Sequence, residues 1–271
     1  MSQPAAKAAE PLLLREDAGG IARLTMNRPA QRNALSRDLM DALQAEFAHI
    51  AGDRTVRAVV LAGAGPGFCA GHDLKELTAA RAEADRGRAF YEATMRQCSA
   101  LMQAIVHCPK PVIARVHGIA TAAGCQLVAS CDLAVAADEA KFATPGVNIG
   151  LFCSTPMVAL SRNVARKQAM EMLLTGEMIS AARAVEFGLV NRAVPAAELD
   201  AAVARFAETI ASKSAHTVSI GKRAFYEQLE KPLAEAYDYA SEVMVRNMLA
   251  RDAEEGIGAF IEKREPTWED R

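Results

Sequence analysis

The sequence predicts an α/β protein whose strands and helices alternate over two thirds of the chain and give way to helices alone near residue 195. Continuous apolar stretches of five or six residues, typical of buried strands, recur between segments of helical period. From about residue 197 onward only the helical period remains. We therefore predict an α/β core over residues 1–195 and a helical module over residues 196–271.

Caps and prolines set the expected boundaries within the core. Residues 1–11 are expected to be a disordered start. Ser36 is a typical helix N-cap, Pro109 and Pro111 end the helix before them, and Thr155–Pro156 begins another helix. We predict a polar stretch at 75–87, a hairpin of strands 12–16 and 20–27, strands at 56–61, 112–116, 132–137 and 141–144, and helices at 37–51, 88–107, 122–130, 156–162 and 167–174.

The C-terminal module is expected to contain four helices, at 197–213, 215–230, 232–250 and 252–264. Asp252 and Glu255 stand three residues apart before an apolar run, which is the pattern of a capping box.

Composition excludes several classes of function. The net charge is −2 and 24% of the residues are charged, so the chain has no basic field for nucleic acid and no acidic tail. No apolar run approaches the roughly 20 residues of a membrane span. The first 14 residues carry one Lys and few Arg or Ser, so neither a signal peptide nor an organelle-targeting peptide is expected.

The six cysteines show no Cys-x-x-Cys spacing and lie in apolar or small-residue segments, which predicts free thiols and a reduced cytoplasmic setting. Cys69 and His72 form one Cys-x-x-His pair without a second, so no metal site is predicted. The stretch Ala58–Gly67 imitates a dinucleotide-binding turn, but it offers G-x-G-x-G rather than G-x-G-x-x-G and no helix pattern begins there. No permanently bound cofactor is expected.

Two stretches carry most of the functional information: Gly63–Asp73 (GAGPGFCAGHD) and His117–Asp132 (HGIATAAGCQLVASCD). Each is interpreted as a buried strand that runs into a tight turn of small residues and then into a helix. Such turns leave backbone N–H groups unpaired at a helix start. Two of them facing each other would form an oxyanion hole for a polarised thioester carbonyl.

These stretches, together with Asn27–Ser36 (NRPAQRNALS) and Lys141–Leu151 (KFATPGVNIGL), resemble the motifs of the enoyl-CoA hydratase/isomerase (crotonase) superfamily in order and spacing. The resemblance covers nearly the whole chain. It implies a spiral of repeated strand–strand–helix units, a coenzyme A thioester as the ligand, and a trimer or pair of trimers assembled through the C-terminal module.

The resemblance also implies the roles of particular residues. The oxyanion donors map onto the backbone N–H groups of Ala70 and Ala123, and Gly71 and Gly124 keep the approach open. The Ala123 position is usually glycine, so alanine fits only if its φ is negative. Residues implied to contact coenzyme A are Arg28, Ala30, Arg32, Ala70, Gly71, His72, Asp73, Leu74 and Gly124, with Lys263 reaching a phosphate from a neighbouring subunit. Asp73 can equally be the cap of a short helix, and the cations can equally be solvated surface charges.

The acid–base positions depart from the family pattern. The two glutamates that share proton transfer in the family correspond here to Gln126 and Gly146, and a third position used in some branches is Ser154. General acid–base groups each contribute typically about 10²–10⁴ in rate, so we expect weak or atypical hydration.

Few other side chains are candidates to replace the missing glutamates in proton transfer. His72 lies beside the first turn and is a candidate base, whereas His117 is more simply a packing residue at a strand end. Cys153 would need a base partner to act as a nucleophile. Tyr91 and Cys98 are expected to line the acyl pocket.

Three functions remain open from the sequence: a hydratase or isomerase with non-standard proton transfer, a non-catalytic acyl-CoA binder, and a structural oligomer with vestigial pockets. Gln126 favours the binder, because an amide donates a hydrogen bond but does not cycle a proton.

Overall fold

The computed structural model describes residues 10–271, so the expected disordered start lies largely outside the described residues. Two sheets form the core. The six-stranded sheet has the order β1-β2-β3-β5-β7-β10, and the four-stranded sheet has the order β4-β6-β8-β9. The strands are β1 Leu13–Ala18, β2 Ile21–Met26, β3 Ala58–Gly63, β4 Gly67–Cys69, β5 Val112–Val116, β6 Ile119–Thr121, β7 Leu133–Ala137, β8 Lys141–Ala143, β9 Ile179–Ser180 and β10 Arg192–Val194.

Each central strand of the large sheet is followed, a few residues later, by a strand of the small sheet. This holds for β3 and β4, β5 and β6, and β7 and β8. Pairing is parallel throughout the series, except that β1–β2 is an antiparallel hairpin and β8–β9 is antiparallel. The predicted α/β spiral of repeated strand–strand–helix units is therefore confirmed.

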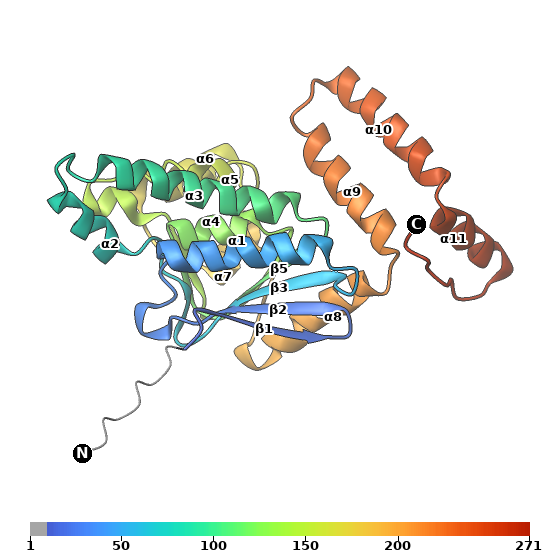
Figure 1. The fold of residues 1–271 in the computed structure, drawn as a ribbon, viewed down its shortest axis with the longest axis horizontal. Helices are drawn as coiled ribbons and strands as arrows, with labels where there is room; N and C mark the ends of the chain where they lie inside the picture. Colours follow the sequence, from blue (N-terminus) through green and yellow to red (C-terminus); the bar gives the residue numbers. More distant parts are fainter. Residues whose placement is uncertain (1–9) are drawn as a thin grey trace, which may run out of the picture.

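Helices cover both faces of the large sheet (Figure 1). The helices are α1 Arg37–Gly52, α2 Leu74–Ala79, α3 Arg88–His107, α4 Ala123–Ser130, α5 Pro156–Leu160, α6 Arg166–Thr175, α7 Ala181–Glu186, α8 Leu199–Ala211, α9 Ala215–Gln228, α10 Leu233–Met248 and α11 Arg251–Glu262. Val59 and Leu61 of β3 point into the main core with α1 and α3, whereas Val60 packs against α8. This alternation is what a strand buried on both faces requires.

Most predicted elements are present. Ser36 caps α1 by accepting a hydrogen bond from the Leu39 N–H at 3.2 Å, as expected. The strand predicted at 56–61 lies two residues later, and part of the polar stretch at 75–87 forms α2 and a 3-10 turn over Ala80–Ala82. Five strands, β4, β6, β8, β9 and β10, have only two or three residues and are too short for a periodic pattern, and of these five only β8 was predicted.

The predicted capping box at Asp252 is wrong. Helix α11 begins one residue earlier, and Asp252 is buried within its first turn. Its carboxylate accepts hydrogen bonds from the backbone N–H groups of Glu269 and Asp270, at 2.7 and 3.0 Å. Glu255 instead pairs with Arg264. Both acidic side chains therefore fix the C-terminal tail and not the helix start.

Helices α9, α10 and α11 extend away from the core, whereas α8 packs on the sheet (Figure 1). A buried ion pair joins α9 to the core: Lys222 Nζ lies 2.7 Å from the Asp132 carboxylate and donates to the carbonyls of Ile105 and Lys110. The Tyr226 hydroxyl donates to the same carboxylate at 2.9 Å. The boundary expected near residue 195 stays a prediction.

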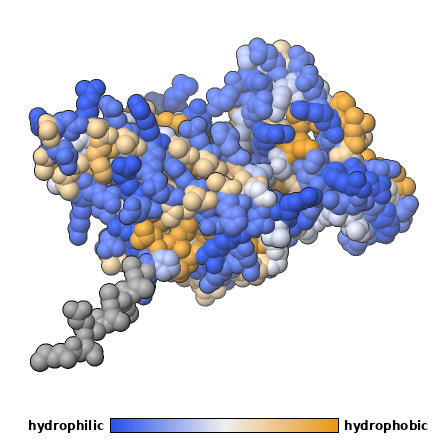
Figure 2. Space-filling model, viewed as in Figure 1, coloured by the Kyte–Doolittle hydropathy of each residue, from blue (hydrophilic) through white to orange (hydrophobic). Residues whose placement is uncertain are grey.

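The extended helices expose many large hydrophobic side chains, and Figure 2 shows hydrophobic residues among them. Leu249 is 83% exposed and Phe260 is 84% exposed, which is unusual for leucine and phenylalanine in a folded chain. Others of the same kind are Phe225, Leu229, Leu233, Tyr237, Met244, Val245, Met248, Ile257 and Ile261. Contiguous apolar surface of this type marks an interaction surface. Among the described residues, no helix is both long and apolar enough to cross a membrane.

Candidate active site

The two turns singled out in the sequence face each other. One follows β4 and leads into α2, and the other follows β6 and leads into α4. A methyl group added at Gly124 would lie 2.1 Å from the Cys69 carbonyl oxygen, and one added at Gly71 would lie 3.4 Å from the Ala123 backbone nitrogen. Both glycines are therefore needed for the close approach of the two backbones.

Ala70 does not supply a free donor, contrary to the expectation. Its backbone N–H donates to the Arg32 carbonyl at 3.0 Å. Two residues after Ala70, His72 forms a parallel bridge with Leu35. In this bridge the Leu35 N–H donates to the Gly71 carbonyl, and the Leu35 carbonyl accepts from the Asp73 N–H. Because backbone groups alternate in direction along an extended segment, the His72 N–H points away from Leu35. It has no acceptor among the described residues.

The Ala123 N–H, predicted as the second donor, is free in the structure, and its role toward a ligand stays a prediction. The Ala123 N–H belongs to the first turn of α4, where helix geometry provides no partner, and no acceptor is found for it within residues 10–271. The backbone N–H groups of His72 and Ala123 thus give one free donor at each of the two facing turns.

Positive φ occurs at Ala122 and not at Ala123. Ala122 has φ +51° and ψ −118°, a conformation that only glycine adopts without strain, and it is the N-cap of α4. The condition set for alanine at position 123 is therefore met, since its φ is not positive. Ala123, inside the helix, tolerates alanine, whereas Ala122 holds a strained backbone at the entrance to the donor pair.

The first predicted coenzyme A loop is tied to the turn by an ion pair. Arg28 lies 2.9 Å from the Asp73 carboxylate, and the two side chains are 16% and 9% exposed. Arg28 also donates to the Ala34 carbonyl. Burial acts to raise the pKa of Asp73, but the Arg28 guanidinium and the Lys75 N–H together lower it. Arg28 is therefore a structural cation that ties the loop to the turn and not a solvated surface charge, and its contact with coenzyme A stays a prediction.

The other loop and turn residues predicted to contact coenzyme A are exposed to solvent. Ala30 and Arg32 are exposed, as is Leu74, whose exposed fraction is 53%. Asp73 caps α2 by accepting from the Lys75 N–H at 3.0 Å, which confirms the alternative that it caps a short helix, while its contact with coenzyme A stays a prediction.

Asn33 was missed by the sequence interpretation and organises this loop. It is fully buried, with φ +55°, a conformation that Asn tolerates better than most residues. Its side chain accepts from the Arg28 N–H and donates to the carbonyls of Ala64 and Gly67, all at 2.9 Å. The signal available in the sequence was an Asn directly before the apolar pair Ala34 and Leu35, ahead of the Ser36 cap.

Lys263 lies at the end of α11, in the left-handed conformation and exposed. Figure 1 places α11 at the opposite end of the molecule from α2. Within one chain, Lys263 and the predicted coenzyme A loop are not brought together.

The position of the first family glutamate holds a buried amide. Gln126 is 4% exposed, and its Oε1 lies 3.8 Å from the Cys98 thiol of α3. Burial raises the pKa of Cys98 to about 12, so the thiol stays protonated at neutral pH and donates to the amide oxygen. Cys98 is itself fully buried, and it contacts Gln126 on the side that faces α3.

The position of the second family glutamate is closed as well as empty. A methyl group added at Gly146 would lie 2.8 Å from the Leu151 carbonyl oxygen and 3.0 Å from the Cys153 sulfur. The backbone of residues 151–153 thus occupies the space that a side chain would need. Ser154, at the third position, donates to the Phe152 carbonyl at 3.3 Å and carries no charge.

The candidate replacement groups are held in neutral forms. Burial lowers the pKa of His72, and neither of its ring nitrogens has a partner among the described residues. His117 lies 2.8 Å through Nε2 from the Gly65 carbonyl, consistent with packing at a strand end. Burial raises the pKa of Cys153, which leaves its sulfur a poor nucleophile.

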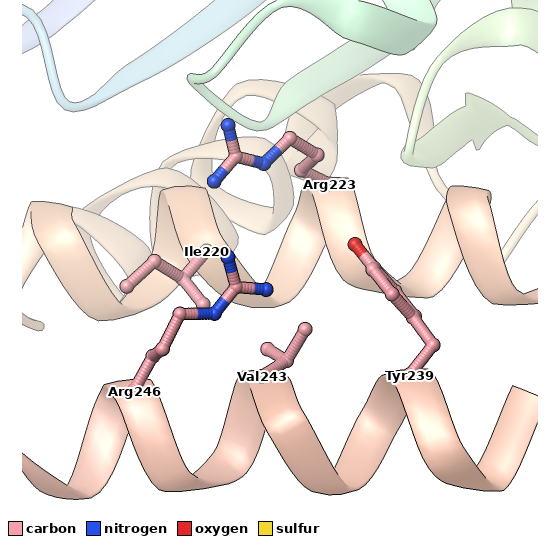
Figure 3. Close-up of a pocket in the computed structure, with 5 residues that line it drawn as sticks. All are labelled: Ile220, Arg223, Tyr239, Val243 and Arg246. Atoms are coloured by element: carbon pink, nitrogen blue, oxygen red, sulfur yellow. The ribbon is translucent and has the colours of Figure 1, made fainter.

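Two hollows lie outside the facing turns. One of about 430 Å³ is lined by Arg81, Arg86 and Tyr91, and the Tyr91 hydroxyl donates to the Leu77 carbonyl at 2.9 Å. The second, of about 60 Å³, lies between α9 and α10 (Figure 3). It is lined by Ile220, Arg223, Tyr239, Val243 and Arg246, none of which was a predicted site residue.

The fold with its two facing turns is that of a crotonase-type protein, and comparison with known proteins agrees. The profile of the enoyl-CoA hydratase/isomerase family matches residues 16–271, so the chain belongs to this family. It is 47% identical over 268 residues to rat enoyl-CoA hydratase domain-containing protein 3, mitochondrial, covering 98% of this chain and 88% of the rat protein. The human protein of that name is 49% identical, with 92% and 80% covered.

Solved structures give the same result. An enoyl-CoA hydratase of Mycobacterium smegmatis superposes with a TM-score of 0.92 at 53% identity, covering 96% of this chain and 99% of the other. Human enoyl-CoA hydratase domain-containing protein 3 superposes with a TM-score of 0.91 at 47% identity, covering 95% and 100%.

The expected cytoplasmic location is contradicted by these comparisons. The rat, mouse, human and Xenopus laevis relatives are all named mitochondrial. The prediction rested on unpaired cysteines, and free thiols indicate a reducing environment without distinguishing one compartment from another.

Proposed function

We propose that this protein binds coenzyme A thioesters and polarises the thioester carbonyl through the backbone N–H groups of His72 and Ala123, with hydration of enoyl-CoA weak or atypical. The observation that carries the proposal is the pair of facing turns with free N–H groups, beside two glutamate positions that hold Gln126 and Gly146. One such donor is worth about 10²–10³ in rate, so polarisation alone supports slow chemistry.

Coenzyme A thioester is proposed as ligand and not as a permanently bound cofactor. The exposed Arg32 and Ala30 in the loop, with Gly71, His72 and Leu74 at the turn, are proposed to contact the coenzyme A moiety. Lys263 is proposed to contribute from a second copy, which suits its place on the exposed α11. The apolar surface of α9 to α11 supports a homo-oligomer, proposed to be a trimer or a pair of trimers.

A second candidate is a non-catalytic acyl-CoA binder of the same fold. The closed Gly146 position favours it, because a backbone segment fills the space where the second carboxylate would lie. This candidate predicts binding with no turnover in either direction.

The test is hydration of crotonyl-CoA by the purified protein, with binding of butyryl-CoA measured alongside by calorimetry. Slow turnover with micromolar binding supports the first proposal, and binding without turnover supports the second. Rapid turnover would overturn the inference from the missing carboxylates and direct attention to His72. Absence of binding would reject both and leave a structural oligomer.

The informative variant is Gln126→Glu alone, because it restores a carboxylate where space exists. Gly146→Glu requires residues 151–153 to move and is not a clean restoration. The matched control is Gln103→Glu, the same change on the exposed surface of α3. We expect turnover to rise in Gln126→Glu and to be unchanged in the control.

A further inference from the structure

We propose that Arg223 of α9 and Arg246 of α10 form a binding site for a small oxyanion, with phosphate as the preferred ligand, in the hollow between the two helices (Figure 3). The juxtaposition that carries this is a pair of guanidinium groups without partners that line one small recess. The site includes neither of the facing turns and does not rest on the function proposed above.

The two arginines differ from the others in this part of the chain because nothing within the chain neutralises them. Among the described residues, neither guanidinium group forms an ion pair or donates a hydrogen bond. The three other arginines that follow residue 215 each pair with a glutamate, at 2.6 to 2.8 Å: Arg251, Arg264 and Arg271. A guanidinium group carries five N–H donors, so the hollow presents donors and positive charge without an acceptor.

Both cations act on the same hydroxyl group in the hollow. Burial and the Glu227 carboxylate raise the pKa of Tyr239, whereas the charges of Arg223 and Arg246 act to lower it. The Tyr239 hydroxyl donates to Glu227 at 2.7 Å, and Lys231 Nζ lies 3.8 Å from the same carboxylate. Three cations thus lie about Tyr239 against one carboxylate, which Tyr239 and Lys231 already share. This excess of positive charge favours an anion in the hollow.

The size and lining of the hollow set the class of ligand. Its volume is about 60 Å³, far below the roughly 300 Å³ at which pockets for drug-sized molecules begin. It therefore admits one small group, and Ile220 and Val243 give that group nothing to bond to. Guanidinium groups match the paired oxygens of phosphate and carboxylate groups. Two positive charges favour the more highly charged phosphate over a single carboxylate or chloride.

The hollow lies apart from the apolar surface of the same helices. Phe225 follows Arg223 by two residues and Met248 follows Arg246 by two, and residues two apart on a helix do not face the same side. Phe225 and Met248 are exposed, whereas Val243 on the hollow side of α10 is buried. A second copy that packs on the apolar side would leave the hollow open. This favours a free anion over an acidic side chain of that copy.

The test is phosphate binding by the full-length protein, measured by calorimetry at fixed pH with sodium chloride holding the ionic strength constant. We expect saturable binding with a dissociation constant of about 1 mM, as for a ligand held by a few charge-assisted hydrogen bonds. Acetate should bind at least about tenfold more weakly. Absence of saturable binding at constant ionic strength, or equal binding of acetate, would overturn the proposal.

Variants assign the binding to its source. Arg223→Gln and Arg246→Gln each remove one guanidinium group and should weaken phosphate binding about tenfold. Both side chains are exposed and bond to nothing else in the described chain, so we expect both variants to fold. The matched control is Arg205→Gln, an exposed arginine of α8 outside the hollow, which should keep the affinity of the wild type. Phosphate binding that survives in both hollow variants would refute the assignment.

Two further readouts separate this site from other roles of the two arginines. The affinity for butyryl-CoA in phosphate-free buffer should be unchanged in both variants. A parallel loss would place the arginines at the coenzyme A site and overturn a separate anion site, whereas no butyryl-CoA binding by the wild type would reject only the function proposed above. The molar mass in analytical ultracentrifugation should also be unchanged. A wild type that binds no phosphate, with variants of lower mass, would show that a second copy fills the hollow.

Discussion

Ala122→Gly should stabilise the protein although it removes a methyl group. The conformation at φ +51°, ψ −118° costs an L residue about 1–3 kcal/mol. Glycine relieves this strain, at about 0.5–1 kcal/mol of added chain entropy on unfolding and about 0.4 kcal/mol of lost methyl burial at this half-buried position. The net expectation is a gain of about 1 kcal/mol in the free energy of unfolding.

Ala123→Gly is the matched control, because it is the same chemical change one residue later. Ala123 is fully buried in the first turn of α4, so glycine there loses about 0.8 kcal/mol of methyl burial and up to about 1 kcal/mol of helix propensity. The two variants should therefore shift the free energy of unfolding in opposite directions, with a difference of about 2–3 kcal/mol between them.

The assay is urea unfolding of both variants and the wild type at one protein concentration, followed by far-UV circular dichroism. A gain of about 1 kcal/mol corresponds to roughly 2–4 °C in melting temperature for a chain of this size. A loss of stability in Ala122→Gly as large as that in Ala123→Gly would show that the turn carries no strain.

Three further predictions concern the site and its supports. Gly146→Ala should destabilise the protein by about 1–3 kcal/mol in urea unfolding, because its methyl group meets the Leu151 carbonyl, whereas Gly258→Ala, with open space around it in α11, should not. Lys222→Met should lower the free energy of unfolding by about 3 kcal/mol and speed amide exchange in α9, because it leaves the partly buried Asp132 carboxylate without its ammonium partner. Adding Asp132→Asn should recover part of this loss. No change in Lys222→Met would contradict the role of the ion pair in anchoring α9. Burial lowers the pKa of His72 in the folded state, so the unfolded chain binds the proton more tightly and the free energy of unfolding falls as pH drops below about 6.5. His72→Phe should flatten this pH dependence of stability between pH 7 and pH 5. An unaltered profile would show that His72 is not the source of the dependence.

The sequence predicted the elements whose signals are local. The long helix over Arg88–His107 and the strand over Val112–Val116 were placed to the residue, since apolar period and flanking prolines define both. The second turn and the helix that follows it were also placed to within one residue. Local propensity sufficed wherever the deciding contacts lie within a few residues.

What the sequence did not predict depends on contacts between distant segments. Ala70 was assigned as a donor from its position in a motif, but the bond to Arg32 is made by a loop 38 residues earlier. Arg28 was expected either to contact coenzyme A or to be a solvated surface charge, yet it pairs with Asp73, which lies 45 residues away in the chain. Asp252 fitted a capping pattern and instead holds the C-terminal tail.

The two departures from the family's acid–base pattern are structurally different. At Gln126 the space for a carboxylate is kept, the side chain is oriented by Cys98, and a single substitution changes acid to amide. At Gly146 the neighbouring backbone has taken the space, so recovery of a carboxylate needs the segment 151–153 to move. Because the space at Gln126 is kept while the space at Gly146 is closed, the structure is compatible with the proposed acyl-CoA site and unfavourable to proton transfer by two carboxylates, so a rise in turnover is expected from Gln126→Glu and not from Gly146→Glu.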